Sequence, residues 1–481
     1  MKETPKTQKS FLRPPIVTVL GHVDHGKTTL LDYIRSTSVA KKEAGGITQK
    51  IGASVVETKA SGQEGIRPGG KITFIDTPGH AVFSNMRSRG TKLADIAVLV
   101  VASDDGVKPQ TKEALEYIFG VGIPFIVAAT KIDLASAQPD RVKDELEKMG
   151  VKFEGKGGDT PFVKLSAKSG EGVDNLLEII NLVAEMHDIS ADPKNPLEAV
   201  VIETGKDKRG PTVSVVLKDG CLLIGDEVVT ETQKAKVRGL FDHRNNPVKS
   251  VGPGEPVLIL GFSNLPLVGS KLKKLSQDSV LELEAKDKIP EVKSDEGEIA
   301  IVLKTQSAGS LEAIRANLPK EVIVIFSGVG EVVESDIFLA KSADALILSF
   351  ESKVNSNIMK LAEMEGVTIE TFDVVYEIFE KLKELIEKGQ LEILGRAEII
   401  AKFPFNSKSV AGCKILLGKI SKTDSLLLIR EEKEIGQVKI TSMRKGRENI
   451  ELVKQGEECG IIFSPQLDFK IGDVILSVRN N

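Results

Sequence analysis

Residues 16–28 read IVTVLGHVDHGKT, and this stretch decides the fold of the first part of the chain. The run IVTVL is apolar and β-branched, which predicts a buried strand, and the segment TTLLDYI that follows predicts a helix. The turn between them matches the pattern GxxxxGK[ST], in which backbone N–H groups cradle phosphate oxygens. A glycine turn with an unrelated lysine is the alternative, but the flanking strand and helix favour a phosphate-binding loop (P-loop).

The pattern of strands and helices divides the 481 residues into several parts. After a flexible tail at 1–13, strands alternate with helices through 14–190, which predicts a mostly parallel sheet in a P-loop domain. Short β-branched runs separated by Gly, Asp, Asn and Pro predict β-barrels further on. The expected later parts are a β-barrel at 196–285, an α/β/α domain at 295–372, a connecting helix at 373–388 and a second β-barrel at 391–481. The predicted fold class is therefore multidomain, α/β plus β.

Composition excludes several classes of protein. The net charge of −4, from 65 Lys and Arg against 69 Asp and Glu, excludes a globally basic protein that coats nucleic acid by bulk charge. Three cysteines without a close pair argue against a disulfide framework and fit a reducing, cytoplasmic compartment. The polar first residues resemble no secretory signal, and the apolar runs are far shorter than the ~20 residues of a membrane span. We therefore expect a cytoplasmic protein, a monomer, with no membrane partner.

A second motif, DTPG at residues 76–79, ends the predicted strand KITFI. In P-loop enzymes a carboxylate such as Asp76 holds Mg²⁺, usually through water, and a glycine lets the backbone approach the γ-phosphate. Lys27 would place its ammonium on the β- and γ-phosphates, and Thr28 would offer its hydroxyl to the same metal ion. DTPG alone is a common turn, but after a P-loop it predicts a metal site.

Two later loops, TKID and SAK, each follow a predicted strand and resemble the guanine-reading loops of GTPases. Asp133 would accept hydrogen bonds from guanine N1–H and the 2-amino group, which adenine cannot supply. Lys131 would lie along the base, and the Ala167 N–H would reach the guanine O6. The usual first residue of TKxD is Asn, and Thr130 cannot make all the bonds of an amide, so we expect at most a modest loss of affinity.

GHVDHGKT together with DTPGH resembles the motifs of the translational GTPases. The segment GIT, ending at Thr48, fits their first switch, in which this threonine contacts Mg²⁺ and the γ-phosphate in the GTP state only. The resemblance implies that His80 orients the attacking water and that Val23 and Ile47 flank it as a hydrophobic gate. It also implies a monovalent cation near Asp24, although this residue could simply cap the turn.

Over about residues 14–478 the order of the parts resembles the bacterial-type translation initiation factor 2 family. The segments that carry the likeness are GPTVSVVLKDG, SAGSLEAI, SGVGEVVESD and GVTIETFDVVYEIFEKLKE. The resemblance implies a ribosome-dependent GTPase that binds formyl-methionyl initiator tRNA and promotes its binding to the 30S subunit. It further implies joining of the 50S subunit with GTP hydrolysis on 70S formation, and contacts with other initiation factors.

Two other functions remain open. The chain could be another tRNA-carrying translational GTPase, although such proteins would carry barrels in place of the α/β domain and connecting helix. It could also be a non-hydrolysing GTP-regulated binding scaffold. Multiple-turnover phosphate release, with and without ribosomes, separates an enzyme from a scaffold.

The sequence departs from the family pattern in two places. The P-loop begins close to the first residue, so we expect a short form without the family's N-terminal extension. In the last barrel the segment SMRKGR lacks the usual aromatic, which weakens the expected contact with methionine or the terminal base. The positions that match the family's initiator-tRNA site are Arg444, Lys445, Glu458, Cys459, Gly460 and Cys413. The two cysteines could instead be buried core thiols.

The expected cofactors are GTP or GDP, Mg²⁺ held by Thr28, Thr48 and Asp76, and the monovalent cation. The expected GTP-binding residues are Gly21, His22, Val23, Asp24, His25, Gly26, Lys27, Thr28, Thr29, Thr48, Asp76, Gly79, Thr130, Lys131, Asp133, Ser166, Ala167 and Lys168. Arg87 and Arg89 follow DTPGH and could supply an arginine finger, but we expect a solvated helix face.

The base-reading assignment makes a direct prediction. In Asp133→Asn the carboxylate that accepts from guanine becomes an amide, so xanthosine triphosphate, with an oxygen in place of the 2-amino group, should compete with GTP. Competition of the two nucleotides against labelled GTP measures the change. An unchanged preference for GTP would contradict the assignment.

Overall fold

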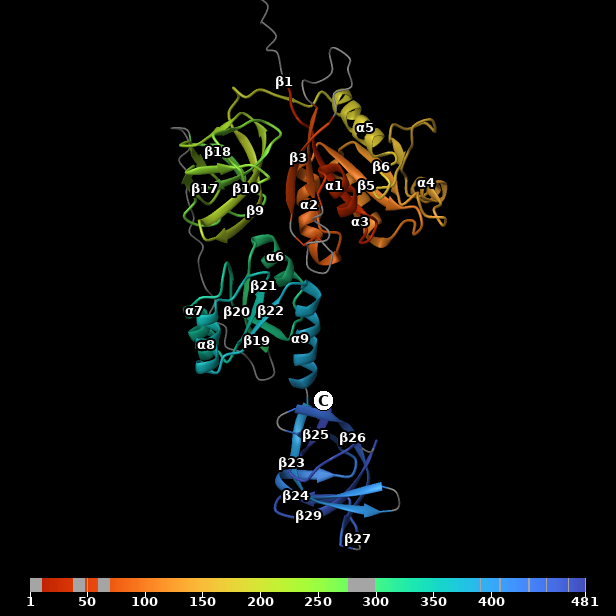
Figure 1. Ribbon diagram of the computed structural model, residues 1–481, viewed down its shortest axis with the longest axis vertical. Coiled ribbons are helices and arrows are strands. Elements are labelled where there is room, and N and C mark those ends of the chain that lie inside the picture. The colour runs from red at the N-terminus through yellow and green to blue at the C-terminus, as the bar shows by residue number, and fades with distance from the viewer. Residues whose placement is uncertain are drawn as a thin grey trace, which may run out of the picture. The chain divides into compact units, whose positions relative to one another are not determined.

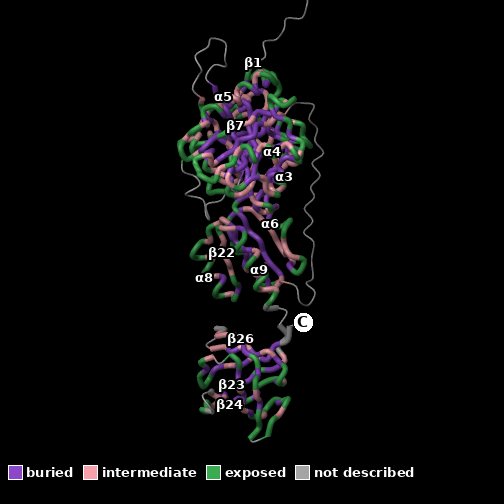
Figure 2. The backbone as a smooth tube through the Cα atoms, turned by 90° about the vertical axis from the view of Figure 1, so that its right-hand side faces the viewer, coloured by how far each residue is buried: buried purple, intermediate pink, exposed green. Residues whose placement is uncertain are grey.

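The computed structural model describes residues 11–37, 48–49, 51–58, 70–275, 299–389, 391–405, 408–430, 433–446, 448–465 and 467–480. The chain forms two compact units (Figure 1). The first holds the P-loop domain, the first barrel and the α/β domain, and it continues to Ile378. The second is formed mainly by Phe379–Asn481. Buried backbone runs through the interior of each part, with exposed residues outside it (Figure 2).

The P-loop domain is built on a six-stranded sheet in the order β3-β4-β2-β5-β6-β7. Its strands are β2 (Ile16–Gly21), β3 (Gly52–Glu57), β4 (Lys71–Asp76), β5 (Ile96–Ala102), β6 (Phe125–Thr130) and β7 (Phe162–Lys164). All neighbouring pairs are parallel except β3 with β4. The carboxyl ends of the parallel strands therefore meet at one edge, and the loops with the sequence motifs begin there.

Helices cover both faces of this sheet. They are α1 (Lys27–Arg35), α2 (Ser84–Leu93), α3 (Pro109–Val121), α4 (Pro139–Glu147) and α5 (Val173–Met186), with a short 3₁₀ helix η2 (Ala81–Phe83) before α2. One apolar cluster joins the sheet to α1 and α5, and another joins it to α3 and α4. Every residue of β5 is buried because this central strand, IAVLVVA, is covered on both sides.

The first barrel is an eight-stranded sheet folded around its own apolar core. Its main strands are β9 (Glu198–Asp207), β10 (Gly210–Asp219), β12 (Glu227–Val229), β13 (Lys234–Lys236), β14 (Gly239–Phe241), β15 (Pro247–Val248), β17 (Pro256–Leu260) and β18 (Lys271–Lys274). Two short pairs complete this region: β11 (Leu222–Leu223) with β16 (Ser250–Val251), and β1 (Phe11–Leu12) with β8 (Ser190–Ala191). All the strand pairs recorded in the barrel are antiparallel, as the alternating β-branched sequence predicts.

The α/β domain carries a four-stranded sheet in the order β20-β19-β21-β22. Its strands are β19 (Ile299–Thr305), β20 (Val322–Val329), β21 (Leu346–Phe350) and β22 (Ile369–Phe372), and its helices are α6 (Ala308–Ala316), α7 (Glu334–Ser342) and α8 (Ser356–Glu365). Helix α9 (Val375–Gly389) follows, so the connecting helix begins two residues later than the 373 expected from sequence. Among the helices in the described ranges, none is long and apolar enough to cross a membrane.

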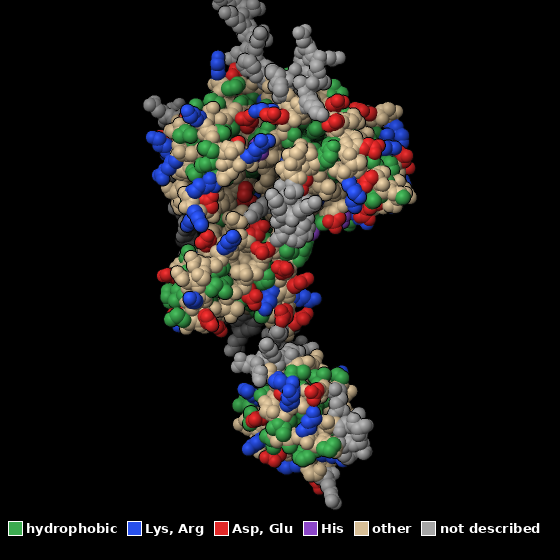
Figure 3. All heavy atoms as spheres, viewed as in Figure 1, with side chains coloured by type: hydrophobic (Ala, Val, Ile, Leu, Met, Phe, Trp, Pro, Cys, Tyr) green, Lys and Arg blue, Asp and Glu red, His purple; other side chains and the backbone are tan. Residues whose placement is uncertain are grey.

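The second barrel closes because β23 pairs with both β24 and β30. Its strands are β23 (Leu391–Phe405), β24 (Lys408–Ser421), β25 (Ser425–Arg430), β26 (Lys433–Lys445), β27 (Glu448–Asn449), β28 (Leu452–Lys454), β29 (Glu458–Ser464) and β30 (Val474–Asn480). A single apolar cluster fills its interior. On the face of the molecule that Figure 3 shows, acidic and basic side chains are interspersed. The predicted class, multidomain α/β plus β, is confirmed.

Candidate guanine-nucleotide site

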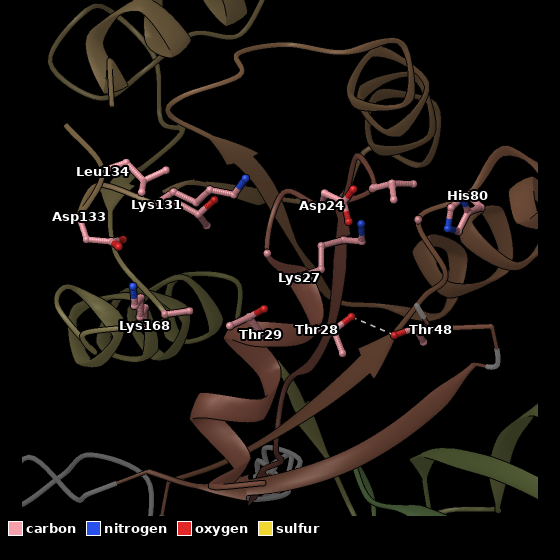
Figure 4. A pocket seen from close by; sticks show the side chains of 15 residues that line it. Asp24, Lys27, Thr28, Thr29, Thr48, His80, Lys131, Asp133, Leu134 and Lys168 are labelled. Atoms are coloured by element: carbon pink, nitrogen blue, oxygen red, sulfur yellow. Dashed lines mark hydrogen bonds between the residues drawn. The ribbon is translucent and has the colours of Figure 1, made fainter. Parts of the chain in front are cut away.

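The loops that follow β2, β4, β6 and β7 line one cavity of about 360 Å³ (Figure 4). The lining residues are Val23, Asp24, Gly26, Lys27, Thr28, Thr29, Thr48, Gly79, His80, Thr130, Lys131, Asp133, Leu134, Ala167 and Lys168. All of them except Leu134 belong to the set expected from sequence. The expected residues that do not line the cavity are Gly21, His22, His25, Asp76 and Ser166.

Lys27 is the buried cation of the P-loop. Its ammonium donates hydrogen bonds to the carbonyls of Gly21, at 3.0 Å, and His22, at 2.5 Å. Burial lowers the pKa of Lys27 to about 8, although Asp76 opposes the shift. A Cβ atom at Gly79 would lie 2.5 Å from the lysine Nζ, so a larger residue here would displace the ammonium from its present position. The loops after β2 and β4 therefore meet at the lysine that would hold the phosphates.

Three oxygen-bearing side chains make a suitable magnesium site. The hydroxyls of Thr28 and Thr48 lie 2.9 Å apart, as the dashed line in Figure 4 marks. Asp76, at the end of β4, is buried, and within the described residues its Oδ1 has no hydrogen-bond partner. Burial raises the pKa of Asp76 to about 6, an effect that the nearby cations Arg35 and Lys27 partly offset. Hydroxyl and carboxylate oxygens are the ligands that Mg²⁺ prefers, so these residues fit the ion.

The base-reading residues lie at the opposite end of the cavity from Thr48 and His80 (Figure 4). The Ser166 hydroxyl donates to Asp133 Oδ1 at 2.7 Å, which orients the carboxylate and lowers its pKa below the usual value. An ionised carboxylate at this position would accept hydrogen bonds from guanine N–H groups. Leu134, missed by sequence reasoning, offers an exposed apolar side chain beside this carboxylate. Its position directly after TKID was the available signal.

Thr130 connects the base-reading loop to the P-loop. Its hydroxyl donates to the carbonyl of His25 at 2.6 Å, and the side chain is almost fully buried. This hydrogen bond joins the end of β6 to the turn before α1. The threonine hydroxyl therefore makes one of the hydrogen bonds that an asparagine amide could make at this position. His25 itself is buried, and burial lowers its pKa to about 4, which keeps the ring neutral.

Arg87 corrects an expectation from sequence. Its side chain is only 1% exposed, so it lies neither on a solvated helix face nor in the cavity as an arginine finger. It donates to the carbonyls of Pro78 and His80 and makes two 2.9 Å bonds to the carboxylate of Glu113 on α3. Arg87 therefore fixes the turn that carries His80. Arg89 is partly exposed and pairs with Glu312, 2.7 Å away.

His80 lines the edge of the cavity beyond Lys27 (Figure 4). Its Nδ1 lies 2.5 Å from the hydroxyl of Tyr376 on α9, and its Nε2 is buried without a partner among the described residues. Burial, reinforced by the charge of Lys27, lowers the pKa of His80, so the ring is neutral at physiological pH. Val23 lines the same cavity, whereas Ile47, the other expected gate residue, lies outside the described residues.

The expected initiator-tRNA positions divide into two groups. Arg444 on β26 lies opposite Gly460 on β29, and Lys445 and Glu458 are exposed close by. Cys413 and Cys459 also lie opposite each other on adjacent strands, but both side chains are buried in the barrel core. Burial raises the pKa of the Cys459 thiol to about 11 and raises that of Cys413 as well. The two cysteines are core thiols, which corrects their assignment as contact residues.

Comparison with known proteins agrees with this site. The family model described as elongation factor Tu GTP binding domain matches residues 13–186. The family model of elongation factor G domain 2 matches residues 196–275, and that of translation-initiation factor 2 matches residues 271–383. Translation initiation factor IF-2 of Thermoanaerobacter sp. (strain X514) is 41% identical over 510 residues, covering 99% of this chain and 72% of that protein. The chain belongs to the translation initiation factor IF-2 family.

Other members are similarly close. IF-2 of Thermotoga sp. (strain RQ2) is 42% identical over 496 residues, which cover 96% of this chain and 70% of that protein. Among solved structures, GDP-bound aIF5B from Aeropyrum pernix aligns with 97% of this chain and 92% of its own, at 27% identity and a TM-score of 0.46. As a member of the IF-2 family with an elongation-factor-type GTP-binding domain, the protein is a translational GTPase that binds guanine nucleotide.

The two shifted pKa values predict a pH window for nucleotide binding. Below about pH 6 Asp76 is protonated in the free protein, so Mg²⁺ should be held less well. Above about pH 8 Lys27 is neutral in the free protein and must take up a proton to bind phosphate. The affinity for GDP with Mg²⁺ should therefore be highest between these values.

Titration with a fluorescent GDP analogue between pH 5 and 9 measures this window. Calorimetry near pH 8.5, in buffers of different ionisation enthalpy, should detect proton uptake. The titration is repeated in EDTA, which removes Mg²⁺. The loss of affinity at low pH that depends on the metal should then disappear, and the loss caused by protonation of the nucleotide itself should remain. No proton uptake above pH 8 would contradict the assignment to Lys27.

Proposed function

We propose that this protein is a ribosome-dependent GTPase that delivers formyl-methionyl initiator tRNA during translation initiation. It would promote tRNA binding to the 30S subunit and then 50S joining, with GTP hydrolysis when the 70S ribosome forms. The observation that carries the proposal is the match to IF-2 proteins over nearly the whole chain, together with the guanine-nucleotide cavity in its P-loop domain. It would act in the cytoplasm, as a monomer, together with other initiation factors.

Hydrolysis would depend on positioning rather than covalent chemistry. Lys27 would bind the β- and γ-phosphates, while Thr28, Thr48 and Asp76 would hold Mg²⁺, which neutralises phosphate charge when bound. His80 would orient the water that attacks the γ-phosphate. Among the described residues that line the cavity there is no arginine, so the site lacks a group that could act as an internal arginine finger. Hydrolysis would therefore be slow until the ribosome reorients His80.

Loss of the γ-phosphate would release Thr48 and Gly79, which approach it from two different loops. Both loops would then relax, as in other GTPase switches. The change would pass to the later parts of the chain through the connecting helix α9. Asp24 lines the cavity, so its carboxylate would be available to a monovalent cation beside the phosphates, which we include in the proposal.

The initiator-tRNA site would lie on the exposed face of β26 and β29. Arg444, Lys445 and Glu458 are exposed there, and Gly460 is partly exposed opposite Arg444. Two cations suit the phosphates of an acceptor end, and a carboxylate suits N–H groups of a base. The buried Cys413 and Cys459 would support this face from inside the barrel.

His80→Ala should keep GTP affinity but lose ribosome-stimulated hydrolysis by about 10²-fold or more, the scale of a lost proton-transfer or water-positioning group. Multiple-turnover phosphate release with 70S ribosomes measures the loss. His243→Ala, which changes an exposed histidine of the first barrel, is the matched control. Normal stimulated turnover in His80→Ala would remove this residue from the mechanism. Absence of turnover in the wild type would favour a non-hydrolysing scaffold.

Full-length protein should bind formyl-methionyl-tRNA in preference to unformylated methionyl-tRNA and elongator tRNA. Arg444→Ala should weaken that binding by about tenfold, within the range for a lost arginine contact to nucleic acid. Arg396→Ala, an exposed arginine on β23 of the same barrel, is the control. Filter binding at fixed salt measures each affinity. Preferred binding of an elongator tRNA would instead favour another tRNA-carrying translational GTPase.

A further inference from the structure

The first turn of α9 is bound by the residue that follows Thr48. The side-chain amide of Gln49 donates to the carbonyl of Asp373 at 2.7 Å and accepts from the backbone N–H of Val375 at 3.0 Å. Gln49 is only 4% exposed, so these two hydrogen bonds are protected from water. Because the first N–H groups of a helix lack partners within it, Gln49 caps α9 from outside. This explains why the helix begins at Val375.

The same turn of α9 also holds His80. The hydroxyl of Tyr376 lies 2.5 Å from His80 Nδ1, and the two rings meet edge to face with their centroids 5.0 Å apart. One helical turn therefore contacts two loops at the same end of the nucleotide site. It touches the loop with Thr48, whose hydroxyl lies beside Thr28, and the loop after DTPG.

The hydrogen bond has a preferred direction. An unprotonated imidazole nitrogen is a better acceptor than a phenol oxygen, and burial raises the pKa of Tyr376, so its hydroxyl keeps the proton. The phenol therefore donates to Nδ1, and the neutral ring of His80 must carry its own proton on Nε2. In this state neither ring nitrogen can accept a proton from water. This hydrogen bond to Nδ1 also holds the His80 ring at the edge of the cavity.

We propose that Tyr376 is a positioning residue that restrains His80 in a resting orientation, and that Gln49 makes this restraint depend on the loop of Thr48. Activation then requires the first turn of α9 to move and to release His80 toward the γ-phosphate. The low hydrolysis rate without ribosomes comes partly from this restraint. The inference rests on the proposed role of His80 in orienting water and adds a second residue that controls it.

The decisive variant is Tyr376→Phe, which removes the hydroxyl and keeps the ring. Its ribosome-free single-turnover GTP hydrolysis should be about two- to tenfold faster than in the wild type, the range for loss of one hydrogen bond. GTP affinity should not change. Tyr33→Phe is the matched control, since this tyrosine is exposed and does not line the cavity. An unchanged or slower rate in Tyr376→Phe overturns the restraint.

Gln49→Ala tests the connection to the loop of Thr48. It should raise the ribosome-free rate in the same direction as Tyr376→Phe. The double variant should be no faster than the faster single variant, because both act on one restraint. Independent, multiplying effects of the two substitutions would overturn the coupling.

A readout without nucleotide separates this inference from the role of His80. The chain has 5 histidines, so the ¹⁵N ring signals can be assigned by loss of one set in His80→Ala. At pH 8 the His80 signals should report an unprotonated, hydrogen-bonded Nδ1 and a protonated Nε2, and Tyr376→Phe should shift the Nδ1 signal. An Nδ1 signal that does not move overturns the hydrogen bond itself. The Nδ1 signal could move in Tyr376→Phe while His80→Ala leaves ribosome-stimulated hydrolysis intact. In that case the hydrogen bond between Tyr376 and His80 stands, and the proposed role of His80 in hydrolysis is wrong.

Discussion

The buried ammonium of Lys27 is the constraint on which the nucleotide site depends. A cation with 7% exposure is costly to bury, and among the described residues its ammonium donates hydrogen bonds to two backbone carbonyls of its own loop. The loop after β4 must come close enough to complete its surroundings, and this is possible because β4 lies next to β2 in the sheet and because Gly79 has no side chain. A bound phosphate would supply the missing negative charge. The sheet order, the glycines of the P-loop and of DTPG, and the position of α1 together create the surroundings of this one charge.

Sequence patterns predicted what is local in the chain. The P-loop, DTPG, TKID and SAK are each contiguous, and each follows a strand of a parallel sheet, so their meeting at one edge follows from topology alone. The cavity accordingly contains one lining residue, Leu134, outside the expected set. The connecting helix was expected within two residues of its observed start for the same reason: its apolar residues recur at helical spacing.

Contacts between distant segments could not be predicted in this way. Nothing in the spacing of Arg87 and Glu113 indicates that they pair, and a charged residue in SNMRSRG is more often solvated than buried. The bonds from Gln49 to the start of α9 join residues more than 300 positions apart in the chain. Such contacts depend on how separately folded layers pack, which hydrophobic periodicity does not encode. The role of Thr130 was similarly hidden, because its partner is a backbone carbonyl.

The burial of Cys413 and Cys459 has a practical consequence for studies of the protein in solution. Thiol reagents attack thiolates that they can reach, and these two sulfurs are both covered and held in the protonated form. Cys221, between β10 and β11 of the first barrel, is the partly exposed cysteine of the three. A maleimide dye added to the native sequence should therefore attach at one defined place. The protein thus offers its own labelling position for fluorescence experiments on the ribosome, without removal of any cysteine.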